Sequence, residues 1–163
     1  MGTETRRVRT VTWDDPFVVM QNAPGKTGLE ILREMFEGRL PPPPIANLMG
    51  FTGVSADEGR VVFEGEPGEY LYNPIGVVHG GFAMTLLDSA MGCAVHSTLD
   101  VGERYTTLEV KTNFVRPITV NTFPSASAAR ARCCIAAAAS RPRRERCSRS
   151  AAGSCWRMER PHA

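Results

Sequence analysis

The last quarter of the sequence contains few of the residues from which strands are built. Residues 124–163 hold 11 Ala, 9 Arg and 6 Ser, but only one Ile, one Trp and no Val, Leu, Phe or Tyr. Half-buried strands are marked by β-branched and aromatic residues at a period of two. This segment has no such period, so we expect an irregular Ala- and Arg-rich tail rather than part of a sheet.

The body of the chain, residues 1–122, has one cysteine, Cys93. Scarce cysteine favours a reducing compartment, and the sequence begins without the apolar run of a secretory signal. Residues 82–99 are long and apolar but include the charged Asp88 and polar residues such as Ser89 and His96. A buried helix is therefore favoured over a membrane span, and we expect a cytoplasmic protein.

The formal net charge of +2 is the sum of two parts of the chain with net charges of opposite sign. Residues 1–122 carry 10 Lys and Arg against 15 Asp and Glu, whereas residues 123–163 carry 9 Arg against 2 Glu. The two net charges are therefore −5 and +7. Taken at face value, the tail is a disordered basic segment that would bind nucleic acid or an acidic surface.

A second interpretation of the tail fits its composition better, namely translation of a GC-rich gene in the wrong frame. If the reading frame begins at the third base of each present codon, the codons of residues 132–136 can encode Val-Leu-His-Arg instead. In the same frame, residues 140–148 can read Ala-Thr-Ala-Glu-Gly-Thr-Leu-Leu, and residues 155–163 can read Leu-Ala-His-Gly-Thr-Ala-Thr-Cys. Because these strand-like segments share one frame, we prefer a one-base slip between about Thr119 and Ala126 to a natural basic tail.

The first part of the body is predicted to contain short helices and a hairpin. Thr27 opens an amphipathic helix that Gly38 ends. Four prolines, 41–44, then form a stiff spacer before another helical turn. Residues 51–55 and 60–64 read as two strands joined by a tight turn.

The clearest predicted strand spans residues 105–115. Its alternation places one set of side chains on one side, namely Leu108, Val110, Thr112 and Phe114. Glu109, Lys111 and Asn113 fall on the other side, and Arg116-Pro117 ends the strand.

The segment 73–99 is the centre of the chain. A turn at 73–76 leads through His79-Gly80-Gly81 into a long apolar run that reads as one helix, on which Asp88 is the single full charge. Such a helix needs a sheet to cover it, and the strands predicted before residue 120 are too few for that. The missing strands are expected from the last part of the gene.

One set of residues resembles a motif of the PaaI-type acyl-CoA thioesterases: Asn73, Gly76, His79-Gly80-Gly81, Asp88, Thr106-Thr107-Leu108-Glu109 and Asn113-Phe114-x-Arg116-Pro117. The resemblance covers roughly 50–119. The helix before it resembles a common extension of the group, and the out-of-frame peptides resemble the family's last strands.

The resemblance implies an α+β hotdog fold, in which a curved antiparallel sheet wraps round one long central helix. The last strands of that sheet would be lost here or replaced by the irregular tail. It also implies a homodimer or homotetramer with active sites between subunits, which hydrolyses acyl-CoA thioesters without a metal or prosthetic group. Three parts are expected: an arm with a short helix and Pro-rich spacer (1–44), a hotdog thioesterase core (45–120) and an aberrant basic tail (121–163).

The predicted catalytic residues are Asp88, Gly81 and Thr107. Gly81 and Asp88 are about 10 Å apart along a helix, so one carbonyl group cannot reach both in one chain, and a two-fold partner would supply Asp88. The free N–H of Gly81 would polarise the thioester carbonyl. Asp88 would activate water or attack the carbonyl directly, and Thr107 would hold the water or Asp88.

Substrate-binding roles are predicted for Asn73, His79 and Gly80, which would shape the pocket near the carbonyl. Each candidate also has a structural alternative. Gly80-Gly81 would only make a turn, His79 would cap the helix, Asp88 would join a buried network, and Thr107 would pack in a strand. Met84, Leu87 and Met91 are candidate walls for the acyl group, whereas Cys93 is expected in the core and His96 on the polar surface.

Four possibilities stay open at this point. The first is an acyl-CoA thioesterase, which hydrolyses a CoA thioester to free acid and CoA. The second is a non-catalytic acyl-CoA-binding hotdog protein. The third is a protein whose tail binds nucleic acid or an acidic surface, and the fourth is an inactive chain that lacks its last strands. Neither a membrane nor a nucleic-acid partner is expected, although steeply salt-dependent DNA binding that needs residues 123–163 would indicate the latter.

Overall fold

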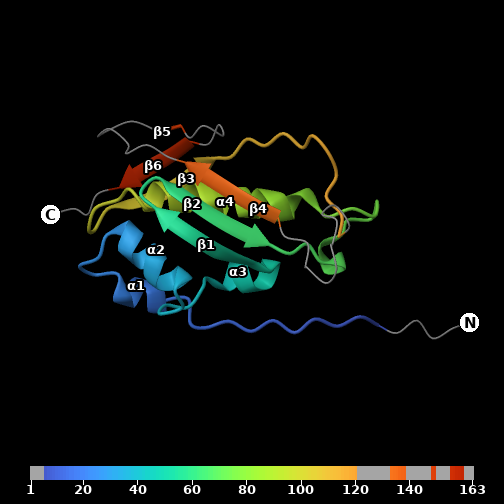
Figure 1. Ribbon diagram of the computed structural model, residues 1–163, viewed down its shortest axis with the longest axis horizontal. Coiled ribbons are helices and arrows are strands. Elements are labelled where there is room, and N and C mark those ends of the chain that lie inside the picture. The colour runs from blue at the N-terminus through green and yellow to red at the C-terminus, as the bar shows by residue number, and fades with distance from the viewer. Residues whose placement is uncertain (1–5, 121–132, 139–147, 150–154, 160–163) are drawn as a thin grey trace, which may run out of the picture.

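The computed structural model describes residues 6–120, 133–138, 148–149 and 155–159 (Figure 1). The helices are α1 (Val18–Asn22), α2 (Gly28–Phe36), α3 (Pro44–Met49), the 3-10 helix η1 (Glu69–Leu71) and α4 (Gly80–His96). The strands are β1 (Phe51–Asp57), β2 (Arg60–Gly65), β3 (Arg104–Glu109), β4 (Cys133–Ala138), β5 (Ser148–Arg149) and β6 (Cys155–Glu159).

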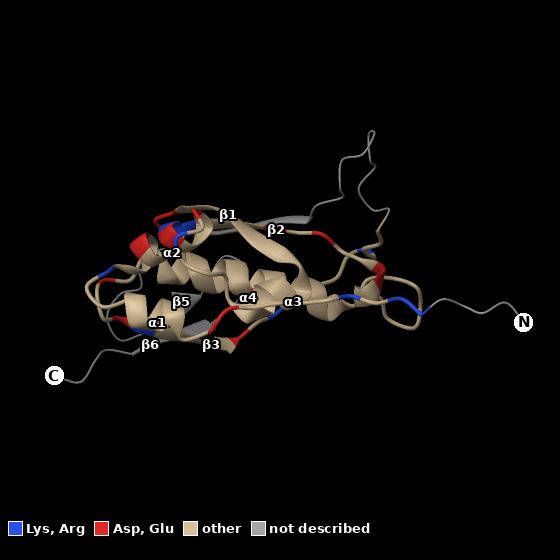
Figure 2. Ribbon diagram, turned by 90° about the horizontal axis from the view of Figure 1, so that it is seen from below, with Lys and Arg blue, Asp and Glu red and all other residues tan. Residues whose placement is uncertain are grey.

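The strands form two antiparallel sheets with α4 between them. One sheet has the order β1-β2-β4 and the other the order β3-β6-β5. Figure 2 shows α4 as the middle layer, and α4 contacts β2 and β4 of the first sheet and β3 of the second. Antiparallel strands around one long helix confirm the predicted α+β hotdog class.

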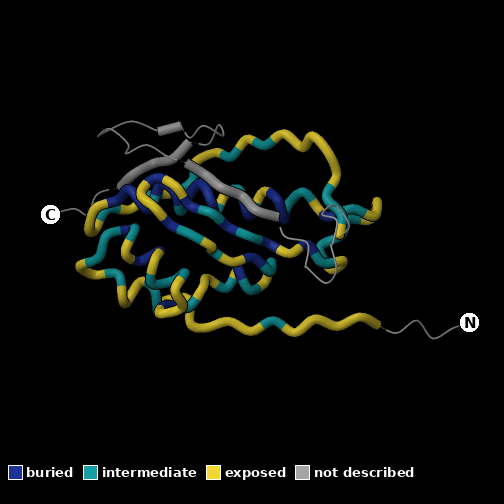
Figure 3. The backbone as a smooth tube through the Cα atoms, viewed as in Figure 1, coloured by how far each residue is buried: buried dark blue, intermediate teal, exposed yellow. Residues whose placement is uncertain are grey.

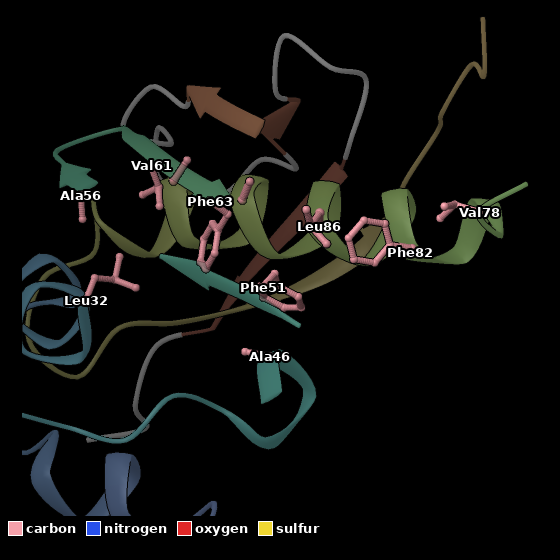
Figure 4. Packing of buried hydrophobic residues seen from close by; sticks show 11 residues of the cluster. Leu32, Ala46, Phe51, Ala56, Val61, Phe63, Val78, Phe82 and Leu86 are labelled. Atoms are coloured by element: carbon pink, nitrogen blue, oxygen red, sulfur yellow. The ribbon is translucent and has the colours of Figure 1, made fainter. Parts of the chain in front are cut away.

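The main core lies between α4 and the β1-β2 hairpin (Figure 4). Phe82 and Leu86 of α4 are almost fully buried, as is Val61 of β2. The rings of Phe51 and Phe63 meet edge to face, with their centroids 5.7 Å apart. Because α4 is apolar on most of its circumference, it can bury one face against each sheet, and a second cluster forms around Met91 and Val95.

The start of α2 is joined to the end of α4. A capping box fixes this start, since Thr27 Oγ1 accepts a hydrogen bond from Glu30 N (3.3 Å) and Glu30 Oε2 accepts one from Thr27 N (2.7 Å). Gly28 N donates to the Leu99 carbonyl at 3.1 Å. A Cβ atom at Gly28 would lie 1.8 Å from the His96 carbonyl oxygen, so only glycine allows the two helices to meet here.

The strand β3 is shorter than the strand predicted over 105–115. Its partner β6 pairs with it only as far as Cys155, which lies opposite Glu109. A β-ladder needs a hydrogen-bonding neighbour, and none continues beyond this point among the residues that the structure describes. Residues 110–117 are therefore not part of a strand. Most of them are exposed along the upper edge of the molecule in Figure 3.

A register shift in β3 alters which of its side chains face α4. The shift lies between Thr107 and Glu109, at Leu108. Tyr105 and Val110 both pack on the Met91–Val95 cluster, although their odd and even positions would put them on opposite sides of a regular strand. Leu108 is 50% exposed, so its predicted place beside Val110 is wrong.

Three segments of the tail differ from the expected irregular structure. The strand β4 pairs with β2 from Cys133 opposite Gly65 to Ala138 opposite Arg60, while β6 pairs with β3 and β5 with β6. Antiparallel pairing uses backbone N–H and C=O groups, so it does not require β-branched side chains. The rest of residues 121–163 lies outside the described residues, and the reading-frame interpretation stays a prediction.

Candidate functional site

Asn73 organises the turn that precedes α4. Its Oδ1 atom accepts hydrogen bonds from the N–H groups of Ile75 (3.1 Å) and Val77 (3.4 Å). Gly76 has a φ of 78°, which favours glycine. The side chain predicted to bind substrate therefore shapes the loop that delivers His79 to the helix start.

His79 is the N-cap of α4, and its imidazole accepts a hydrogen bond from the Gly81 N–H, with Nδ1 2.9 Å from the nitrogen. The prediction that the Gly81 N–H is free is therefore wrong for this conformation. A helix start leaves its first N–H groups without backbone partners, and the imidazole satisfies one of them. The structural alternative for His79 is present here, and its ring stands where a carbonyl oxygen would have to bind.

Gly80 allows Phe114 to approach the helix start. A Cβ atom at Gly80 would lie 3.0 Å from Cζ of Phe114, a ring that is itself 57% exposed. The space beside Gly80 at the helix start is thus occupied by an aromatic ring from the segment that follows β3.

A pocket of about 350 Å³ opens beside the helix start. Its lining consists of Met49, Tyr70, Leu71, Tyr72, His79, Gly81, Phe82 and Thr85. Tyr70 and Thr85 were not predicted as site residues, although the Tyr-Leu-Tyr sequence before the Asn73 turn was a signal for an aromatic wall. A larger pocket, about 590 Å³, lies between α2, the prolines and β1, and it contains none of the predicted site residues.

Asp88 lies two turns along α4, on an exposed face. The Thr107 hydroxyl donates a hydrogen bond to Asp88 Oδ1 at 2.9 Å. The structure therefore brings these two predicted residues together, from the central helix and from β3. The carboxylate keeps access to solvent, so a buried structural network does not describe it.

Asp88 and Gly81 do not meet within one chain. Both belong to the continuous helix α4, so seven residues separate them by about 10 Å. Gly81 lines the pocket at the helix start, whereas Asp88 does not. The structure thus holds two half-sites, an amide end with a pocket and a carboxylate with its hydroxyl partner.

The predicted acyl-pocket walls differ in exposure. Met84 is 41% exposed and Leu87 is half-buried, whereas Met91 is buried in the second core cluster. None of the three lines the pocket at the helix start. Met84 and Asp88 are one turn apart on the same exposed face of α4, so a wall formed by Met84 would belong to the carboxylate half-site.

Cys93, His96 and Tyr105 form a partly buried group near Asp88. Burial raises the pKa of the Cys93 thiol to about 12, and the Asp88 charge adds to this rise. This keeps the thiol protonated, in agreement with its predicted place in the core. The His96 ring lies 5.5 Å from the Tyr105 ring, and burial lowers its pKa, so its predicted surface position is wrong.

The described part of the chain contains no group of three or more His, Cys, Asp or Glu residues arranged to hold a metal ion. Among the same residues, none of the helices combines the length and apolar character that crossing a bilayer requires.

Comparisons with known proteins concern the fold and the family. Residues 75–123 match the model of the family described as "Thioesterase superfamily". This segment includes the helix start, Asp88 and Thr107. No curated protein matches the chain at the level of its sequence.

Several solved structures resemble the fold. A putative thioesterase, phenylacetic acid degradation-related protein, from Ralstonia eutropha JMP134 has 24% identity and a TM-score of 0.57, over 69% of this chain and 80% of that chain. A thioesterase family protein from Silicibacter pomeroyi has 23% identity and a TM-score of 0.54, over 78% and 90%. A mutant of the phenylacetic acid degradation protein PaaI from Thermus thermophilus has 21% identity and a TM-score of 0.50, over 71% and 93%.

The family match covers the segment that carries the motif, and the structural likeness extends over most of the chain. Together they agree with the resemblance carried by the motif: the chain has the hotdog fold, and its segment 75–123 is similar to the thioesterase superfamily.

Proposed function

We propose that the chain hydrolyses acyl-CoA thioesters at sites shared by two copies in a homodimer or homotetramer. Each site would combine the Gly81 end of α4 from one copy with Asp88 of the partner subunit. The observation that carries this proposal is the exposed Asp88–Thr107 hydrogen bond, because it orients a carboxylate on a face that its own helix start cannot reach. A two-fold axis makes each copy supply both halves.

The amide half-site would bind the thioester carbonyl. The N–H groups at the start of a helix carry partial positive charge, which stabilises an oxyanion. His79 accepts from the Gly81 N–H in the present conformation, so its ring would rotate away as the carbonyl oxygen takes its place. The pocket lined by Phe82 and Tyr72 would then hold the acyl group.

The carboxylate half-site would drive the hydrolysis. Asp88 of the partner subunit would take a proton from water, whose oxygen adds to the carbonyl carbon. Collapse of this intermediate breaks the C–S bond as the proton held by Asp88 passes to the leaving sulfur, so that CoA leaves as its thiol and the free acid is the second product. Direct attack by the carboxylate would instead give a mixed anhydride that water then cleaves. In either route Thr107 fixes the reacting carboxylate.

The test of catalysis replaces Asp88 by Asn and measures free thiol released from a panel of acyl-CoAs. The expected turnover falls by about 100-fold or more, while Asp57→Asn, an exposed carboxylate on β1, keeps wild-type turnover. Unchanged turnover in Asp88→Asn would remove Asp88 from the mechanism.

The test of sharing mixes two inactive variants. Asp88→Asn keeps the amide half-site, and Gly81→Pro removes the N–H while Pro is tolerated in the first helical turn. A heterodimer of the two has one intact site if the halves come from different subunits, so about half of the wild-type turnover per heterodimer is expected. A site contained in one chain gives no recovery.

A second function, acyl-CoA binding without hydrolysis, is favoured by one observation. The Gly81 N–H is occupied by His79 Nδ1, and a capped amide cannot polarise a carbonyl. Binding of acyl-CoA, measured by calorimetry, without any release of thiol would establish this function instead.

The protein is expected to be cytoplasmic, as the sequence indicates, and fractionation of cells would test this.

A further inference from the structure

The N-terminal arm, residues 6–13, lies beside the pocket at the helix start. In Figure 1 it runs along the lower edge of the molecule, and Figure 2 shows it passing α3. Arg9 donates hydrogen bonds to the carbonyl oxygens of Leu48 and Asn47. Asn47 Nδ2 donates in turn to the Thr12 carbonyl at 2.9 Å. These bonds hold the arm against the end of α3.

The same arginine covers Tyr70, which lines the pocket. The guanidinium carbon of Arg9 lies 3.9 Å from the centroid of the Tyr70 ring, the geometry of a cation–π contact. A neighbouring ion pair joins Arg7 to Glu69 at 2.8 Å. Both partners of that pair are exposed, so it contributes little, and Arg9 is the main link between arm and pocket.

Two glycines make room for the Tyr70 ring. A Cβ atom at Gly68 would lie 2.2 Å from Cε1 of the ring, and one at Gly50 would lie 3.0 Å from its hydroxyl oxygen. The ring therefore rests in a cradle of backbone with the Arg9 guanidinium on its face. Tyr70 is 49% exposed, so without Arg9 a solvent-facing ring would be free to leave this position.

We propose that the arm supports the wall of the substrate pocket and that Arg9 is a positioning residue that sets acyl selectivity by fixing Tyr70. This inference rests on the proposed thioesterase function. Arg9 touches no reacting atom in it, and its effect passes through the aromatic ring. Acyl groups large enough to reach Tyr70 depend on the contact, whereas an acetyl group does not.

The experiment compares Arg9→Ala, Tyr70→Leu and the double variant with the wild type, and uses Arg6→Ala as the control on the same arm. Turnover is measured with acetyl-CoA, hexanoyl-CoA and benzoyl-CoA. Arg9→Ala is expected to raise KM for the two larger substrates about fivefold, with kcat nearly unchanged and KM for acetyl-CoA unaffected. Arg6→Ala behaves like the wild type.

The double variant separates positioning from a general role in the fold. If Arg9 acts through Tyr70, adding Arg9→Ala to Tyr70→Leu has no further effect on KM. An additional loss in the double variant, or equal KM values in all variants, overturns the inference. Thermal unfolding of each variant, measured alongside, identifies any that do not fold, and Arg9→Lys then replaces Arg9→Ala.

A second readout does not depend on hydrolysis. Calorimetric binding of a hexyl-CoA thioether, which has no carbonyl to cleave, is expected to weaken about fivefold in Arg9→Ala. If Arg9→Ala weakens thioether binding but the wild type releases no thiol from any acyl-CoA, the proposal of catalysis fails and the proposed role of Arg9 stands. If Arg9→Ala binds the thioether as tightly as the wild type does, the proposed role of Arg9 is wrong.

Discussion

The Thr107 hydroxyl donates a 2.9 Å hydrogen bond to the carboxylate of Asp88, which lies 19 residues earlier in the sequence. Thr107 reaches α4 because it precedes the register shift in β3. A hydroxyl that donates to a carboxylate oxygen fixes its rotamer and leaves the other oxygen free to accept a proton. The pair is thus an oriented base on the exposed face of the central helix.

Replacing Thr107 by Val removes this donor while keeping the shape of the side chain. We expect kcat for acyl-CoA hydrolysis to fall about tenfold with KM little changed, because a loosely held base loses alignment but not substrate contacts. Thr107→Ser, which keeps the hydroxyl, should retain most of the activity. Steady-state kinetics on both variants check this, and equal kcat in Thr107→Val and wild type would contradict it.

Replacing Gly28 by Ala places a methyl group against the end of α4. Because the new Cβ would lie 1.8 Å from a backbone oxygen of His96, the helices must separate, and a loss of about 2–4 kcal/mol in unfolding free energy is expected. Gly25→Ala is the comparison, since Gly25 has a φ of 83° but open space around it, so about 1 kcal/mol is expected there. Urea unfolding measures both. Equal losses would mean that the helix contact adjusts without cost.

The stability of the fold is expected to decrease in mild acid because of His96. Burial lowers the pKa of this imidazole below 6.5, so the folded state favours the neutral ring. Below pH 6.5 the unfolded chain binds more protons than the folded chain. The free energy of unfolding therefore decreases as pH falls, by at most about 1.4 kcal/mol per pH unit. Urea unfolding about one unit above and below this pH measures the effect. His96→Gln should flatten the dependence, and an unchanged slope would contradict the assignment.

The nucleotide sequence of codons 117–128 tests the reading-frame interpretation of the tail. We expect a one-base difference from an independently sequenced close copy, whose frame would encode the strand-like segments derived from residues 132–163. Joining β4 to β5 would then give a single sheet in the order β1-β2-β4-β5-β6-β3. The frame-restored protein should unfold at a higher temperature than the present chain. An identical tail in the close copy would end this interpretation.

His79 and the two glycines that begin α4 show how much a sequence pattern can predict. The spacing of His79-Gly80-Gly81 and Asp88 predicts a helix start, a lone carboxylate and the distance between them, because helix rise is fixed by backbone geometry. It left open whether His79 would cap the helix through the Gly81 N–H or bind substrate, since that depends on one side-chain rotamer. Nor could it predict Tyr70 in the pocket, because the ring is held by Arg9, 61 positions earlier.

The sequence by itself determined the elements whose causes are local. The capping box of α2, the hairpin turn between β1 and β2, and the apolar run of α4 follow from residues close together in the chain. Only the tertiary structure decided where β3 ends, which side Leu108 takes, and that Thr107 meets Asp88. Those outcomes depend on pairing with β6 and packing on α4, and the energies of such distant contacts are not written in any short stretch of residues.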